Sequence, residues 1–124
     1  MPYELVWQPS GVVKRFFGWV TGVDLIRSLE QSEADSRFDT LRYVINDFLD
    51  IDGIRMETIG PDLIEELAAI DHAAAGINPN IQIAIVAKDN NLSTLAQGYI
   101  DSDLRSYPTQ LFSTLSAAEA WLKL

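Results

Sequence analysis

The chain has 124 residues, of which 48% are hydrophobic and 22% are charged. This length is typical of one domain with its own core, and this composition is typical of a folded protein rather than a disordered one. We therefore expect a single domain that spans residues 1–124.

The charge and the residue types exclude several classes of protein. Eighteen acidic and nine basic residues give a net charge of -9 at pH 7. Nucleic acids and anionic membranes bind clustered Lys and Arg, which this sequence lacks, so we expect neither as a partner. The absence of cysteine excludes disulfides and thiolate chemistry. No apolar run approaches the ~20 residues of a membrane helix, and the first residues lack a signal-peptide pattern, so we expect no membrane insertion and a cytoplasmic protein.

The first twenty residues predict a β-hairpin. Residues 3–7 are aromatic and β-branched, residues 8–11 form a turn signal, and residues 12–20 resume the strand. Lys14 and Arg15 fall on opposite faces of this second strand, which favours a strand near a sheet edge. Thr21 then predicts the N-cap of a helix, with Asp24 in its first turn, that ends near residues 35–36.

Strands and helices alternate over the rest of the chain. Residues 41–48 predict a buried strand, residues 49–60 an irregular segment, and Pro61 the start of a helix that ends near Gly76. Residues 81–87 predict a buried strand, residues 89–91 the cap of the next helix, residues 109–112 a last strand, and Ser116 the cap of a short final helix. The order β-β-α-β-α-β-α-β-α predicts an α/β fold with a mostly parallel mixed sheet and helices packed on it.

The segment 47–60 is the first place to look for a site, because ligands of open α/β sheets bind beyond the carboxyl ends of the strands. It contains Asp47, Asp50, Asp52 and Glu57. An EF-hand is excluded, because the loop positions that need Asp and Glu would hold apolar residues. A solvated acidic loop is favoured, with a weak divalent-cation site as the alternative.

No residue pattern indicates catalysis. His72 is the sole histidine, and it follows Asp71 on a predicted helix, where adjacent side chains point in different directions. We expect it at the surface. The sequence has no Gly-x-Ser-x-Gly, Walker A or Gly-x-Gly-x-x-Gly motif. The sequence therefore predicts no catalytic residue, no metal ligand and no cofactor, and a protein that is not an enzyme.

The hairpin holds an unusual number of aromatic residues: Tyr3, Trp7, Phe16, Phe17 and Trp19. One face of the hairpin is expected to join the core. Strand alternation sends the other aromatic side chains to the opposite face, where they could form an interface or line an apolar pocket.

The element order resembles the SpoIIAA-like, or STAS-like, domains of bacteria, the fold of anti-sigma-factor antagonists. The stretches that carry the resemblance are Met1–Leu5, Tyr43–Phe48, Ile83–Ala87 and Tyr107–Phe112. It is similar in particular to the STAS/SEC14-like members of unknown function. The antagonists carry a phosphorylatable serine in an Asp-Ser-Ser-Gly-like motif after the central strand. Residues 47–58 contain no serine, with Thr58 as the sole hydroxyl, so a phosphoserine switch is not expected here.

Two hypotheses follow. The first is a non-enzymatic module for protein–protein interaction or regulation that binds a protein partner or forms a homodimer. Its interaction surface would include Asp47, Asp50, Asp52, Glu57, Phe17 and Trp19. The alternative is a carrier or sensor of a small apolar ligand, which the aromatic surplus and the SEC14-like resemblance suggest.

Overall fold

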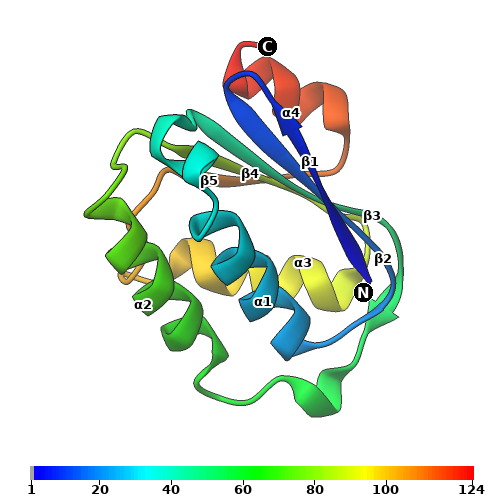
Figure 1. Ribbon diagram of the computed structural model, residues 1–124. Coiled ribbons are helices and arrows are strands. Elements are labelled where there is room, and N and C mark those ends of the chain that lie inside the picture. The colour runs from blue at the N-terminus through cyan, green and yellow to red at the C-terminus, as the bar shows by residue number, and fades with distance from the viewer. Residues whose placement is uncertain (1) are drawn as a thin grey trace.

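The computed structural model describes residues 2–124, and within them five strands form one mixed sheet (Figure 1). The strands are β1 (Tyr3–Gln8), β2 (Gly11–Val20), β3 (Tyr43–Ile54), β4 (Gln82–Val86) and β5 (Thr109–Phe112), and they lie in this order across the sheet. β1 and β2 form the antiparallel hairpin, while β2, β3, β4 and β5 run parallel. The predicted α/β fold and element order are confirmed.

The helices lie on both faces of the sheet. They are α1 (Gly22–Glu33), α2 (Leu63–Ala75), α3 (Asn90–Asp101) and α4 (Leu115–Leu122). Figure 1 shows α1, α2 and α3 on one face, here called the helix face, and α4 on the other, the outer face. α1 packs on β1 and β2, α3 packs on β3 and β5, and α2 packs mainly against α1 and α3 rather than on the strands. Among residues 2–124, no helix is long and apolar enough to cross a bilayer.

Side-chain caps explain where two of these helices begin. At the start of α1, the Thr21 hydroxyl accepts a hydrogen bond from the Asp24 amide, and the Asp24 carboxylate accepts one from the Thr21 amide. This capping box confirms the predicted N-cap. The prediction for α4 is wrong by two residues, because Thr114 rather than Ser116 caps it and accepts from the Ala117 amide at 3.2 Å.

Strand alternation divides the hairpin between the two faces. On β2, Val12, Lys14 and Phe16 point to the helix face and are buried, whereas Arg15 and Phe17 point to the outer face and are exposed. Phe16 stacks on Phe48 of β3, with 4.3 Å between the ring centroids, in the core under α1, α2 and α3. A smaller hydrophobic cluster lies under α4.

β2 lies next to the edge strand β1, which agrees with the expected position near a sheet edge. One expectation about this sheet is wrong. Residues 49–54 are not irregular, since β3 continues to Ile54. The β2–β3 register shifts between Arg15 and Phe17 and again between Gly18 and Trp19, with an extra β3 residue at each shift. These β-bulges interrupt the two-residue alternation, so the sequence pattern did not predict a strand over residues 49–54.

We predict that Phe16→Ala lowers the free energy of unfolding by about 3–5 kcal/mol, because it leaves a cavity between β2 and β3. The adjacent Phe17→Ala variant is the matched control and is expected to cost about 1 kcal/mol or less, since its ring is exposed. Urea denaturation followed by circular dichroism measures both values. Equal losses would contradict the division of β2 between the two faces.

Candidate functional site

An aromatic surface lies on the outer face of β2, formed by Phe17 and Trp19, whose exposed fractions are 42% and 50%. The Trp19 ring lies over Gly53 of β3, where a Cβ atom would come within 2.6 Å of a ring carbon. The Arg55 guanidinium stacks on the same ring at 4.5 Å from its centroid. Phe17 lies opposite Asp50 in the β2–β3 register. The two aromatic side chains are therefore held on a sheet rather than on a loop.

Of the four acidic residues predicted as a site, Asp47 and Asp50 line one shallow hollow together with Arg15. Asp47 is buried and accepts a hydrogen bond from a backbone amide of its own strand at 3.0 Å. Asp50 is exposed and pairs with Arg15 at 2.6 Å, while Asp52 and Glu57 are exposed. Within residues 2–124, no three acidic or histidine side chains are grouped so that they could hold a metal ion.

The hydroxyl and the histidine singled out from the sequence have structural or surface positions. Thr58 donates to the Arg55 carbonyl at 2.6 Å and accepts from the Gly22 amide at 3.0 Å. Its hydroxyl thus joins the short 3-10 helix Met56–Thr58 to the start of α1. His72 is exposed, as expected, whereas its neighbour Asp71 is buried, so the two form no dyad.

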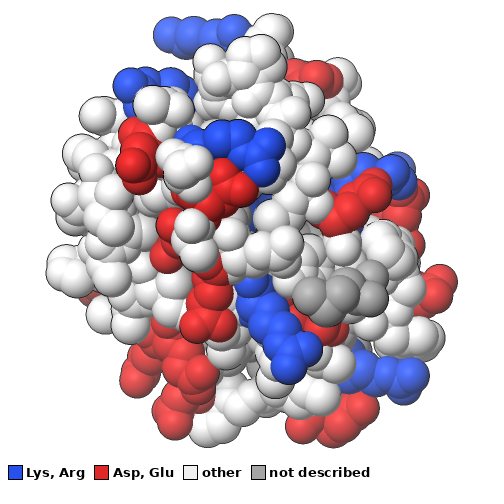
Figure 2. Space-filling model, viewed as in Figure 1, with Lys and Arg blue, Asp and Glu red and all other residues white. Residues whose placement is uncertain are grey.

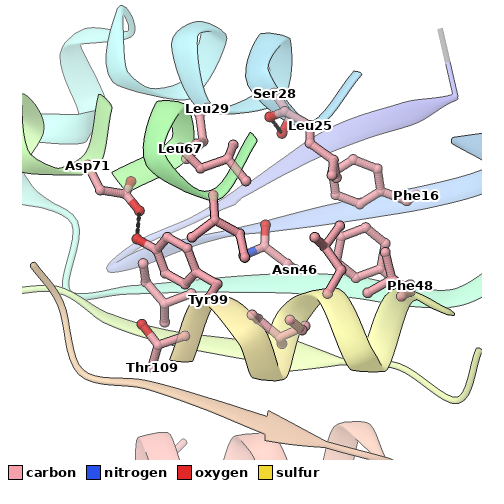
Figure 3. A pocket seen from close by; sticks show the side chains of 16 residues that line it. Phe16, Leu25, Ser28, Leu29, Asn46, Phe48, Leu67, Asp71, Tyr99 and Thr109 are labelled. Carbon is pink, nitrogen blue, oxygen red and sulfur yellow. Dashed lines mark hydrogen bonds between the residues drawn. The ribbon is translucent and has the colours of Figure 1, made fainter. Parts of the chain in front are cut away.

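A pocket lies between the helix face of the sheet and α1, α2 and α3, with a cavity volume of about 100 Å³ (Figure 3). We call it the helix-side pocket. Its walls are mainly apolar and come from each helix and from the strands beneath: Leu25, Leu29, Ile64, Leu67, Leu92, Leu95, Phe16, Phe48, Ile83 and Ile85. Figure 3 shows Phe16 and Phe48 at one end, the hydrogen-bonded pair of Asp71 and Tyr99 at the other, and Asn46 between them.

The polar side chains of this pocket differ in how they are bonded. The Ser28 hydroxyl donates to a backbone carbonyl at 2.9 Å, and so does the Thr109 hydroxyl. The Tyr99 hydroxyl donates to the Asp71 carboxylate. Asn46 differs from these, since its side-chain amide forms no hydrogen bond with any described residue and is not sealed from solvent. Water can therefore reach the middle of the central strand through the pocket.

Lys14 lies beside Asn46 in the β2–β3 register and is 1% exposed. No carboxylate oxygen of the described residues lies within 4.0 Å of its Nζ atom. Burial lowers the pKa of Lys14 to about 8, and the negative charges of Asp71 and Glu33 partly oppose this. The ammonium thus lies between carboxylates without direct contact to either.

Two carboxyl groups that act on Lys14, those of Glu33 and Asp71, have raised pKa values. Burial, with the charge of Asp71, raises the pKa of Glu33 to about 7, and Lys14 partly opposes it. Burial also raises the pKa of Asp71, while the hydrogen bond from Tyr99 and the charge of Lys14 lower it. We call Lys14, Glu33, Asp71 and Tyr99 the buried polar cluster. It brings together one residue from β2 and one from each of α1, α2 and α3.

Sequence reasoning missed this cluster, although part of the signal was present. Val12, Lys14 and Phe16 share one face of β2, and the other two side chains are plainly apolar. A lysine in such an alternating apolar row indicates either a strand end or a buried amine. Glu33, Asp71 and Tyr99 could not be joined to it without knowing how the helices pack.

Figure 2 shows acidic side chains spread across the face that carries α1 and α2. The architecture beneath is an antiparallel hairpin that leads into a parallel sheet, with helices on both faces. This arrangement defines a small α/β domain. No protein-family model and no curated protein matches the chain.

Solved structures confirm that fold. The anti-sigma factor antagonist SpoIIAA in its unphosphorylated form superposes with a TM-score of 0.58 at 13% identity, covering 98% of this chain and 97% of that one. An anti-sigma factor antagonist from Mycobacterium paratuberculosis gives 0.57 at 14% identity, covering 98% and 93%. An uncharacterized protein with a SpoIIAA-like fold from Shewanella loihica PV-4 gives 0.48 at 12% identity, covering 97% and 91%. The first two structures confirm the predicted SpoIIAA-like resemblance as a fold.

We predict that stability falls as the pH rises from about 5 to 7. Because the pKa of Glu33 is about 7 in the folded protein against 4.5 ordinarily, the folded state binds more protons than the unfolded state in this window. The raised pKa of Asp71 acts in the same direction. Glu33→Gln, which resembles the protonated acid, should reduce the fall in the urea midpoint between pH 5 and pH 7.

The control for this variant is Glu30→Gln, an exposed residue of the same helix. It should keep the pH dependence of the unaltered protein. If Glu33→Gln and Glu30→Gln lose stability equally between the two pH values, the buried polar cluster does not govern this dependence.

Proposed function

We propose that the chain is a non-enzymatic binding module of the cytoplasm that recognises a protein partner, or a second copy of itself, through the aromatic surface of Phe17 and Trp19. The exposure of these two large side chains carries the proposal. Aromatic residues and Arg are enriched in protein interfaces, and such anchors contribute most of the binding energy when they become buried.

The surroundings of the aromatic surface fit an interface. Arg15 forms ion pairs with Glu4 at 3.1 Å and Asp50 at 2.6 Å beside it, and all of these side chains are about half exposed. These charged groups would provide the polar rim that usually surrounds an apolar centre. The two solved anti-sigma factor antagonists with this fold lend support to a regulatory interaction.

We predict that the double variant Phe17→Ser, Trp19→Ser loses the partner while it keeps its fold, because both side chains are half exposed. The measurement has two parts. Light scattering after size-exclusion chromatography tests for a homodimer, and capture from a lysate of the host organism, followed by binding assays with the purified candidate, tests for another protein.

The matched control is Ile77→Ser, which removes an even more exposed apolar side chain, 67% exposed, just after α2. It should bind as the unaltered chain does. A monomer that captures nothing would overturn the proposal, and so would a partner that the double variant still binds with unchanged affinity.

A second candidate function is favoured by the helix-side pocket. An apolar cavity with a few polar side chains resembles, on a smaller scale, the usual form of a small-molecule site. We propose a carrier or sensor of a small, largely apolar ligand as this second function. Native mass spectrometry of the chain purified from its own host should then reveal a bound mass that denaturation releases, whereas protein free of any such mass would count against it.

A further inference from the structure

The outer face of the hairpin carries a row of apolar side chains that the helices leave largely uncovered. Val6 of β1 is paired with Val13 of β2 in the register and is 43% exposed. Phe17 and Trp19 continue this row along β2, and both are about half exposed. Val13 and Trp19 lie six positions apart on β2, which is about 20 Å along a strand. The row is therefore long enough to receive a segment of a partner rather than a single side chain.

The shallow hollow that Arg15, Asp47 and Asp50 line, here called the outer hollow, extends from the strands to α4. Leu115 and Glu119 line it from α4, where they lie one helical turn apart and therefore share a face. Among the described residues that line it, Arg15 is the one cationic side chain. The outer hollow thus adds an acidic wall to the apolar row on the same face.

The charges around the outer hollow do not balance. The Arg15 guanidinium donates to Glu4 of β1 at 3.1 Å and to Asp50 of β3 at 2.6 Å, so two carboxylates already share it. Asp47 and Glu119 line the same hollow, and neither belongs to an ion pair of the described residues. Four carboxylates therefore lie around a single guanidinium. Such a surface attracts positive charge and repels negative charge.

This imbalance decides between the two partners that the proposed function leaves open. A two-fold interface places the same surface patch on both subunits, so a second copy would bring the same surplus of carboxylates to this face. Like charges brought together in an interface are strongly unfavourable, and the whole chain has a net charge of -9. The Arg55 guanidinium, which stacks on Trp19 at the far end of the row, still leaves acidic groups in excess. A partner with basic side chains among apolar ones matches both features of the face.

We propose that the outer face binds a basic amphipathic segment of another protein, whose apolar side chains pack on the aromatic surface and whose Lys or Arg side chains pair with the carboxylates of the outer hollow. This inference rests on the proposed function and adds the chemical class of the partner. Buried aromatic anchors supply most of the affinity of an interface, whereas charged groups at its rim supply selectivity. Recognition therefore needs both features in one segment.

The test uses three synthetic peptides of about 14 residues, each of which spans about 20 Å as a helix. The first consists of Leu and Lys with Leu at helical spacing, the second has the same residues in a scrambled order, and the third has Glu in place of each Lys. Each is titrated into the ¹⁵N-labelled protein and followed by NMR. We expect the first to bind about tenfold more tightly than the second, and the third not to bind. The amide signals of β2 and α4 should shift, while those of α2 should not.

Two double variants separate the charge of the outer hollow from the net charge of the chain. Asp50→Asn, Glu119→Gln removes two exposed carboxylates and should weaken the first peptide about fivefold, as expected for two exposed ion pairs. Glu65→Gln, Glu66→Gln is the matched control, because it removes the same charge from exposed positions of α2, and it should change the affinity less than twofold. Equal losses in the two variants would overturn the proposal, since the peptide would then respond to net charge alone.

The outcomes also separate this inference from the function on which it rests. If the Phe17→Ser, Trp19→Ser variant loses a natural partner or a homodimer but the first peptide does not bind the unaltered chain, the aromatic surface is an interface and the basic class is wrong. If the third peptide binds as tightly as the first, the charge assignment is wrong. If the first peptide binds the aromatic double variant and the unaltered chain equally, the proposed function fails, and the apolar half of this inference fails with it.

Discussion

The strands lie across the sheet in the same order as along the chain, and this constraint determines both candidate sites. A right-handed crossover between neighbouring parallel strands places its helix on one particular face. Because the successive crossovers all advance in the same direction, α1, α2 and α3 are placed on the same face. α1 packs on the hairpin strands β1 and β2, and α3 packs on β3 and β5. α2 therefore packs mainly against these two helices. The helix-side pocket lies where these helices and the strands enclose space that their side chains do not fill.

The same constraint leaves the outer face sparsely covered. α4 follows the last strand and packs on β3, β4 and β5. Its eight residues make a helix about 12 Å long, which packs near Val13 in the first half of β2 and leaves the other end of that strand uncovered. Phe17 and Trp19 are therefore exposed on the outer face, whereas Phe16 is buried on the helix face. The aromatic surface and the helix-side pocket draw on alternate residues of β2, so a change to one site can be made without a change to the side chains of the other.

The sequence predicted the element order well, because turns, caps and apolar runs are local signals that the fold obeys. It failed for Asp50 and Asp52, which belong to β3: two bulges disturb the alternation there, and exposed aspartates are poor strand formers. It predicted that Phe17 and Trp19 are exposed, since alternation must expose one row of the hairpin. It missed the buried polar cluster, because Lys14, Glu33, Asp71 and Tyr99 meet through helix packing, and no spacing along the chain encodes that meeting. Lys14 was assigned to a strand from the sequence. That strand was expected near a sheet edge because burial of an amine is costly.

That cost is the reason why Lys14 is informative. A methionine at this position would bury a similar apolar stem and would desolvate no charge, so packing alone does not explain the amine. Burial disfavours the charged form and lowers the pKa of Lys14 to about 8, and the negative charges of Asp71 and Glu33 offset this in part.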